Sequence, residues 1–195
     1  MEKRNCIIVH GCISPAEDEL KLEMDPRTRT YDKHWMPWVK KHLLAKGIRT
    51  DVPMMPTPWY PTYDNYKGEL EKYPVNENTI LVGHSCGSAF LVRWLGETKR
   101  KIQKLILVAP WKIPSDEDGF KHQFYTFAID RTIRERVKSI TIFTSDNEEP
   151  GGKKSVVIFH KALGGTIIEL QGRGHYIQSD MGTVAFPELV KVIMD

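Results

Sequence analysis

The sequence predicts an α/β fold: a three-layer sandwich in which helices cover both faces of a mostly parallel sheet of about six strands. Short runs rich in Ile, Leu and Val recur along the 195 residues, and longer amphipathic stretches separate them. Continuous apolar runs of this length are typical of strands buried on both faces, as in a parallel sheet. The alternation of strands and helices favours βαβ units with right-handed crossovers, which assemble into this architecture.

Six apolar runs are predicted as strands and six amphipathic stretches as helices. In the first helix, Trp35, Val39 and Leu43 fall on one face, and Pro37 is tolerated because it lies in the first turn. No repeat or linker divides the chain, so one domain is expected over residues 1–195. The strands are expected at 6–9, 48–52, 79–82, 105–109, 139–143 and 166–170, and the helices at 34–46, 65–73, 86–97, 129–137, 155–163 and 186–194.

Two stretches interrupt the alternation of strands and helices. Residues 13–33 are polar and have no clear period, which predicts a long loop after the first strand. Residues 54–62 contain three prolines among Met and aromatic residues, which predicts an ordered, non-helical surface segment. The neighbouring aromatic residues Trp59, Tyr60 and Tyr63 fit two interpretations equally, a lining of a substrate mouth or packing against helices.

Composition and charge exclude several classes of function. The 28 basic and 25 acidic residues are spread along the chain, and no basic tract is dense enough to indicate nucleic-acid binding. No segment approaches the ~20 apolar residues of a membrane span, and the first apolar run is too short for a signal peptide. Neither a dinucleotide-binding or Walker A motif nor a metal-ligand spacing is present, so no cofactor and no metal are expected.

The three cysteines favour a reducing compartment over a disulfide framework. Cys6, Cys12 and Cys86 show no C-x-x-C spacing, and Cys6 lies in an apolar run where a buried thiol is the usual state. Together with the lack of a signal peptide, this pattern predicts a cytoplasmic protein.

The motif that carries chemistry is Gly83-His84-Ser85-Cys86-Gly87, a G-x-S-x-G pattern. It follows a predicted strand directly and precedes a predicted helix, which is the context that a nucleophile on a sharp strand-to-helix turn requires. The glycines permit strand and helix to approach, and the helix N-terminus favours developing negative charge. The pattern therefore predicts Ser85 as a nucleophile, with His84 packed beside the site.

A serine nucleophile needs a base and an acid, and both follow in the expected chain order. His175 comes after the last predicted strand and is the predicted general base. The acid should follow the preceding strand, where Asp146 and Glu148 both lie. Asp146 is nearer the strand end, whereas the longer side chain of Glu148 could reach the imidazole from deeper in the turn, so position alone leaves both open.

An oxyanion intermediate needs backbone N–H donors in fixed positions. The residue after the nucleophile, Cys86, is expected to supply one of them. The loop after the first strand, which begins His10-Gly11-Cys12, is expected to supply the other, from the N–H of Cys12.

Four runs carry a resemblance to the small serine hydrolases of the retinoblastoma-binding protein nine type and their bacterial relatives: HWMPWVKKHL, DVPMMPTP, ENTILVGHSCGSAFLVRWL and KLILVAPW. The resemblance extends over nearly the whole chain. It implies an α/β-hydrolase fold without a large cap domain and an esterase-like activity. The family's nucleophile and base correspond to Ser85 and His175, and its oxyanion loop to Gly11-Cys12.

The chain departs from this family in three ways. The stretch 13–33 is longer than the family leads us to expect. The family's acid is usually an Asp directly before Pro, a slot that falls on Glu148 here, which tips the assignment slightly toward Glu148 over Asp146. The L-x-C-x-E pattern is absent, so binding to the retinoblastoma protein is not supported.

The sequence thus predicts a serine hydrolase that acts by Ser-His-acid acyl transfer on a small-molecule ester, amide or thioester. It predicts no nucleic-acid partner and no membrane association. The alternative is a catalytically silent protein-interaction module with the same fold. The discriminating observation is the distance from Ser85 Oγ to His175 Nε2, which an active site should hold within about 3.2 Å.

Overall fold

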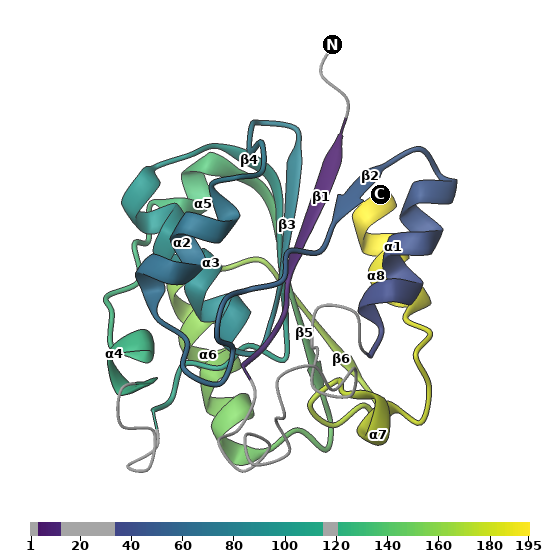
Figure 1. Cartoon of the computed structure of the whole chain (residues 1–195). Coiled ribbons are helices and arrows are strands. Elements are labelled where there is room, and N and C mark those ends of the chain that lie inside the picture. Colours follow the sequence, from purple (N-terminus) through teal and green to yellow (C-terminus); the bar gives the residue numbers. More distant parts are fainter. Residues whose placement is uncertain (1–3, 13–33, 115–120) are drawn as a thin grey trace.

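The computed structural model describes residues 4–12, 34–114 and 121–195, and its centre is a six-stranded sheet with the order β2-β1-β3-β4-β5-β6 (Figure 1). All five neighbouring pairs are parallel. The predicted α/β fold with a parallel sheet of about six strands is therefore confirmed. The strands are β1 (Asn5–Val9), β2 (Arg49–Asp51), β3 (Thr79–His84), β4 (Ile102–Val108), β5 (Val137–Ser145) and β6 (Thr166–Leu170).

Helices cover both faces of this sheet. Figure 1 shows α1 and α8 on one face and α2, α3, α5 and α6 on the other. The helices are α1 (Met36–Ala45), α2 (Tyr63–Leu70), α3 (Cys86–Thr98), α4 (Lys121–Tyr125), α5 (Ile133–Arg136), α6 (Pro150–Leu163), α7 (Gln178–Met181) and α8 (Pro187–Met194).

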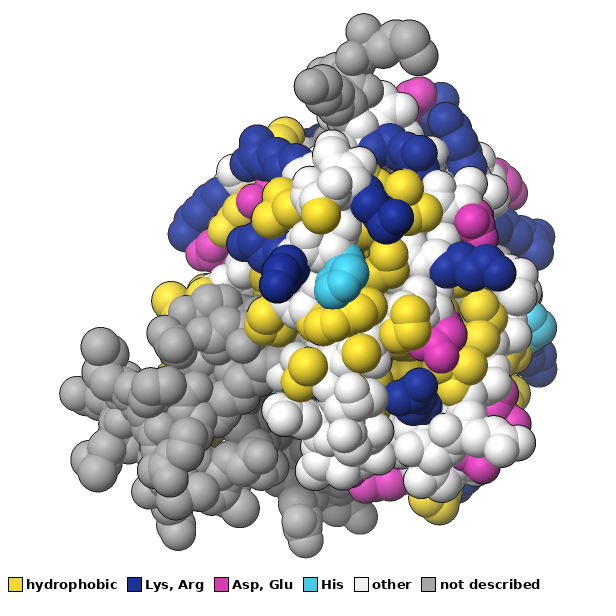
Figure 2. Space-filling view, turned by 90° about the vertical axis from the view of Figure 1, so that its right-hand side faces the viewer, with side chains coloured by type: hydrophobic (Ala, Val, Ile, Leu, Met, Phe, Trp, Pro, Cys, Tyr) yellow, Lys and Arg dark blue, Asp and Glu magenta, His cyan; other side chains and the backbone are white. Residues whose placement is uncertain are grey.

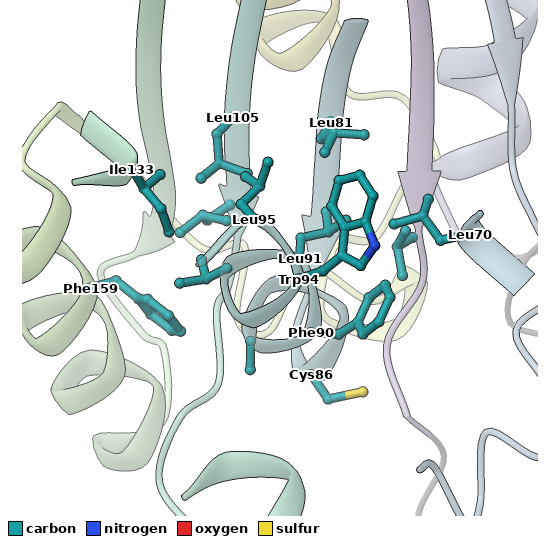
Figure 3. Close-up of a cluster of buried hydrophobic side chains, with 14 of the residues drawn as sticks. Leu70, Leu81, Cys86, Phe90, Leu91, Trp94, Leu95, Leu105, Ile133 and Phe159 are labelled. Carbon is teal, nitrogen blue, oxygen red and sulfur yellow. The ribbon is translucent and has the colours of Figure 1, made fainter. Parts of the chain in front are cut away.

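Each face of the sheet has its own hydrophobic core, because successive side chains of a strand point to opposite faces. In β1, Ile7 belongs to the core under α2, α3 and α6, whereas Cys6 and Ile8 belong to the core under α1 and α8. Figure 3 shows the first of these cores, in which the α3 residues Phe90 and Trp94 pack among side chains from the strands. Burial on both faces explains the continuous apolar runs in β1, β3 and β4, at 6–9, 80–82 and 105–108.

Two predicted elements differ from the structure, and two short helices were not predicted. β6 was expected to be buried on both faces, but it is one of the two edge strands and Ile167 is 41% exposed. The helix expected over 129–137 is the single turn α5, because Val137 already belongs to β5. The short helices α4 and α7 were not predicted. A single helical turn depends on tertiary contacts, so it leaves little periodicity in the sequence.

The proline-containing segment 54–62 is non-helical, as predicted, but it is not simply a surface segment. Met55 is buried, while Met54 beside it is 62% exposed. Tyr63 opens α2, packs against Phe90 and donates its hydroxyl hydrogen to Glu97 of α3. The structure therefore supports helix packing for Tyr63. The predicted loop 13–33 lies outside the described residues.

The face formed by α1 and α8 shows Lys and Arg side chains interspersed with hydrophobic ones (Figure 2). None of the helices in the described part of the chain combines the length and the apolar character that a membrane crossing requires.

The chain reverses direction across the sheet between β1 and β3. After β1 it moves outward to β2, and it then returns past β1 to β3 on the other side. The loops that follow β1 and β3 therefore diverge at the C-terminal edge of the sheet. Such a switch point is where parallel α/β sheets bind ligands.

Candidate active site

Ser85 lies at this switch point, on the sharp turn between β3 and α3. Its φ of 52° and ψ of −123° place a non-glycine residue in the left-handed half of backbone space. The turn is tight because its neighbours lack side chains. A Cβ at Gly83 would lie 2.6 Å from the Ser88 Cα, and a Cβ at Gly87 would lie 2.6 Å from the Val9 carbonyl oxygen. The two glycines therefore permit the close approach that the motif predicted.

Backbone hydrogen bonds fix the turn to the neighbouring strand. The N–H of Ser85 donates to the Val108 carbonyl at the end of β4 (3.0 Å), and the Ser85 carbonyl accepts from the N–H of Trp111 (3.2 Å). The Ser85 carbonyl also accepts from Ser88 in the first turn of α3 (3.0 Å). These contacts hold the strained backbone of Ser85. The half-buried residue lies at the C-terminal ends of the strands.

The structure brings His175 to this hydroxyl. His175 Nε2 lies 2.9 Å from Ser85 Oγ, although the two residues are 90 positions apart in sequence. The His175 backbone is fixed on both sides. Its N–H donates to Asp180 (2.8 Å), and the next residue, Tyr176, is buried and donates its hydroxyl hydrogen to the Thr144 carbonyl (2.7 Å). The imidazole is therefore held by the loop after β6, the last strand.

Of the two candidate acids, the structure brings Glu148 to His175. Glu148 Oε1 lies 3.1 Å from His175 Nδ1, and the Glu148 side chain is fully buried. Oε1 also accepts from the N–H of Glu149 (3.0 Å). The carboxylate needs the space left by a glycine, because a Cβ at Gly152 would lie 2.7 Å from Glu148 Cδ. A carboxylate accepts hydrogen bonds, so this contact places the imidazole proton on Nδ1 and leaves Nε2 to accept from Ser85.

Asp146 has a different set of partners. Its Oδ1 accepts from the N–H groups of Gly172 (2.7 Å) and Asn147 (2.9 Å). The bond from the Gly172 backbone is the main reason why the pKa of Asp146 lies below its ordinary value. Asp146 thus ties the turn after β5 to the loop that carries His175.

The residues on either side of Asp146 make equivalent contacts. Ser145 Oγ accepts from the N–H of Arg173 (2.8 Å), and Asn147 Oδ1 accepts from the N–H of Gly174 (2.8 Å). Three successive side chains therefore accept from three successive backbone N–H groups. This arrangement fixes the distance between the Glu148 turn and His175.

His84 packs beside the site, as expected. It is buried, its ring centroid lies 5.4 Å from that of His175, and its Nε2 donates to the His175 carbonyl (2.9 Å). Burial and the nearby His175 keep the pKa of His84 well below its ordinary value, so the ring is neutral. His84 thus adds a second hydrogen bond between the nucleophile turn and His175, besides the contact from Ser85.

His10 orients the loop that follows β1. Its Nε2 accepts from the N–H of Met55 (3.0 Å), so the proton is on Nδ1, which donates to the Gly11 carbonyl (2.8 Å). That carbonyl belongs to the same planar peptide group as the N–H of Cys12. Gly11 itself leaves little room for a side chain, because a Cβ there would lie 3.0 Å from Ser85 Cβ.

The buried state of His10 predicts a pH-dependent stability. Burial lowers its pKa from 6.5 to about 4, whereas an unfolded chain keeps the ordinary value. Between these values the unfolded state binds the extra proton, so stability is full above about pH 6.5 and falls as the pH decreases. We expect His10 to account for a loss of about 2 kcal/mol by about pH 5. Urea unfolding of wild type and His10→Gln at about pH 8 and about pH 5 measures this change in the free energy of unfolding.

The variant should lose less stability than wild type between the two pH values. It should keep the part of the loss that comes from His84, whose pKa is lowered as well. An identical loss in both proteins would contradict the assignment of a neutral, buried His10.

The cysteines correct a prediction from the sequence. Cys12 and Cys86 form a disulfide, whereas Cys6 is the free, buried thiol that was expected. Burial raises the pKa of the Cys6 thiol, which keeps it protonated. The interpretation that no disulfide forms was wrong because it relied on local spacing, while this pair is joined across the two strands of the switch point. The cysteine pattern therefore no longer supports the prediction of a cytoplasmic location.

Sequence reasoning missed two features that hold His175. The Trp111 ring stands edge-on to His175, with centroids 5.7 Å apart, and Asp180 accepts from its backbone. Trp111 had a sequence signal, because it lies just after β4 beside the expected nucleophile. Asp180 had none, since its role depends on the path of the chain after His175.

Comparison with known proteins shows which proteins this chain resembles in sequence and fold. The chain is 27% identical over 165 residues to the YdeN protein of Bacillus subtilis strain 168, which is named provisionally as a hydrolase; the match covers 82% of this chain and 86% of YdeN. The crystal structure of the ydeN gene product superposes with a TM-score of 0.81 at 24% identity, over 98% of this chain and 97% of that one.

More distant structures share the fold. Est1E from Butyrivibrio proteoclasticus, solved with ferulic acid bound, has a TM-score of 0.65 at 15% identity and matches 99% of this chain and 88% of its own. The 2-hydroxy-6-oxo-6-phenylhexa-2,4-dienoate hydrolase of Rhodococcus sp. strain RHA1 has a TM-score of 0.63 at 12% identity, with coverage of 98% and 91%. These are α/β-hydrolase folds.

The model of the serine hydrolase family matches residues 28–195, a span that includes Ser85, Glu148 and His175. Because this match takes in the whole nucleophile turn and both loops that face it, the chain belongs to the serine hydrolase family.

Proposed function

We propose that this protein is a carboxylesterase-like hydrolase that cleaves small esters, amides or thioesters through an acyl-enzyme on Ser85. The observation that carries the proposal is the continuous line of contacts from Ser85 Oγ to His175 Nε2 (2.9 Å) and from His175 Nδ1 to Glu148 Oε1 (3.1 Å). A protein-interaction module needs none of these contacts. The first distance is also within the limit expected of an active serine.

In the proposed first step, Ser85 Oγ attacks the substrate carbonyl while its proton passes to His175 Nε2. The imidazole becomes a cation, and the Glu148 carboxylate stabilises it at a distance of 3.1 Å. Because the Glu148 side chain is fully buried, water screens this attraction little. His175 then gives the proton to the leaving group, and a water molecule releases the acyl group by the same steps.

The tetrahedral intermediate carries a negative charge that the backbone must stabilise. We assign this role to the N–H groups of Cys86, at the N-terminus of α3, and Cys12, after β1. Both residues lie beside Ser85 at the switch point of the sheet. The dipole of the 13-residue helix α3 adds favourable potential at the same place.

The proposed substrate class follows from the size of the chain and its family. The resemblance to the retinoblastoma-binding protein nine type implies a fold without a large cap domain, and this favours small acyl groups. Est1E, which shares the fold, was solved with an aromatic acid bound. The loops that we expect to line the pocket are 13–33 and 110–125, of which residues 13–33 and 115–120 lie outside the described residues.

A fluorophosphonate probe tests whether Ser85 is an activated nucleophile. We expect the folded wild type to form one covalent adduct on the peptide that contains Ser85, located by mass spectrometry. The heat-denatured protein should not react, because an isolated serine hydroxyl is a weak nucleophile. The same preparation should hydrolyse p-nitrophenyl acetate.

The outcome separates the enzyme from the silent interaction module. Absence of both the adduct and hydrolysis in protein that is folded by circular dichroism would contradict the proposal. An adduct elsewhere, with an unmodified Ser85 peptide, would contradict the assignment of the nucleophile.

A further inference from the structure

The two residues to which we assign the oxyanion N–H groups are also the two that the disulfide joins. Cys12 follows β1, Cys86 opens α3 at a sequence separation of 74, and their Cα atoms lie 5.8 Å apart. We propose that the Cys12–Cys86 disulfide is a positioning device of the oxyanion hole, which holds the two donors at a fixed separation and makes hydrolysis depend on its oxidation state. The inference rests on the proposed function, since it concerns the same reaction.

Packing fixes the Cys86 side of the bond. Cys86 is fully buried in the first turn of α3, and Figure 3 shows it at one end of the hydrophobic core. The next residue, Gly87, approaches β1 so closely that an added Cβ would lie 2.6 Å from the Val9 carbonyl oxygen. The sheet and the helix therefore set the position of the Cys86 N–H without help from the disulfide.

On the Cys12 side, the half-buried residue packs against the margin of the core, and the described hydrogen bonds act on the residues that precede it. His10 Nδ1 donates to the Gly11 carbonyl (2.8 Å), which fixes the tilt of the peptide group that also carries the Cys12 N–H. The hydrogen bond sets the direction of this N–H, and the disulfide sets its distance from the Ser85 turn. Two restraints thus act on one donor, one through the main chain and one through the side chain.

The required precision makes the second restraint matter for catalysis. An oxyanion donor works when it lies about 2.7–3.1 Å from the oxygen that becomes charged. A displacement of about 1 Å can lower the rate roughly a hundredfold. Because the donor acts on the transition state, its displacement should lower kcat and leave KM nearly unchanged.

A dithiol reagent such as dithiothreitol provides the chemical means to open the bond. Cys12 is partly exposed whereas Cys86 is buried, so the thiolate of the reagent attacks Cys12 Sγ and Cys86 leaves as a thiolate. The second thiol of the reagent then displaces the Cys12 thiolate and closes a cyclic disulfide. In total, two electrons and two protons pass from the reagent to the cysteine pair.

The test compares ester hydrolysis before and after reduction in a Cys6→Ala protein, in which the pair supplies every remaining cysteine. We expect reduction to lower kcat for p-nitrophenyl acetate roughly ten- to a hundredfold, with KM changed less than about twofold. Reoxidation with diamide should restore kcat. Alkylation and mass spectrometry count the thiols in each state, and the reduction experiment needs no substitution at either bonded position.

A double variant, Cys12→Ser with Cys86→Ser, is the matched control. Its kcat should equal that of the reduced protein, and dithiothreitol should not change it. A merely structural disulfide would instead lower the thermal stability on reduction and leave kcat unchanged in protein that is still folded, which would overturn the inference. Two alkylatable thiols in Cys6→Ala protein purified without reductant would overturn it as well.

These outcomes are distinct from failure of the proposed function. Oxidised protein that reacts with the fluorophosphonate probe and keeps its kcat after complete reduction refutes the disulfide's role and retains the hydrolase. Oxidised, folded protein that neither reacts with the probe nor hydrolyses the ester refutes both.

Discussion

Replacing Ser85 by Ala should lower kcat for p-nitrophenyl acetate by roughly four to six orders of magnitude, the largest effect we expect of any single substitution. The substitution removes the hydroxyl that lies 2.9 Å from His175 Nε2. Alanine keeps the Cβ and the backbone hydrogen bonds of the turn, so the fold and the thermal midpoint should change little. Steady-state kinetics and a thermal melt measure the two quantities on the same preparation.

Ser179→Ala is the matched control, because Ser179 is an exposed serine of α7 close to His175 in sequence. It should keep wild-type kcat within about twofold, since surface substitutions usually have small effects. A Ser85→Ala protein with more than about a tenth of wild-type kcat would show that another group performs the attack.

Replacing Glu148 by Gln should lower kcat roughly a thousandfold, whereas Asp146→Asn should lower it less than about fivefold. The glutamine removes the charge that stabilises the imidazolium and no longer fixes the proton on His175 Nδ1. An asparagine at position 146 keeps the oxygen that accepts from Gly172 and Asn147. Kinetics of the two isosteric variants under the same conditions separate the acid from its neighbour.

The pair of variants also controls for folding, because each exchanges one oxygen for an NH₂ group in the same turn. Equal losses in both variants would indicate that the turn as a whole had moved. A larger loss in Asp146→Asn than in Glu148→Gln would overturn the assignment of the acid.

The sequence predicted the inner part of the fold because burial on both faces leaves a direct signal there. β1, β3 and β4 each contain a continuous buried apolar run, at 6–9, 80–82 and 105–108, and the G-x-S-x-G pattern marks the turn in which strand and helix must nearly touch. β6 gives the same apolar signal over Thr166–Leu170, yet it is exposed. Its exposure depends on its place at the edge of the sheet, and no local pattern encodes that place.

The acid and the disulfide needed three-dimensional information of a similar kind. Asp146 and Glu148 are two residues apart, and what separates them is the direction in which the turn presents each carboxylate. Cys12 lies shortly after the end of β1, and Cys86 directly follows the nucleophile at the end of β3; these two strands pair in parallel. Their proximity follows from the strand order, so the pairing becomes predictable once β1 and β3 are known to be neighbours.

The disulfide also affects which type of residue can serve as the nucleophile at position 85. In acyl transfer, a cysteine thiolate is a common alternative to serine because it attacks carbonyl carbons readily. At position 85, a thiolate would be the immediate sequence neighbour of the bonded Cys86, and exchange between thiol and disulfide could compete with attack on the substrate. A hydroxyl takes no part in that exchange. The covalent tie between Cys12 and Cys86 therefore favours an oxygen nucleophile over a sulfur nucleophile at the residue beside it.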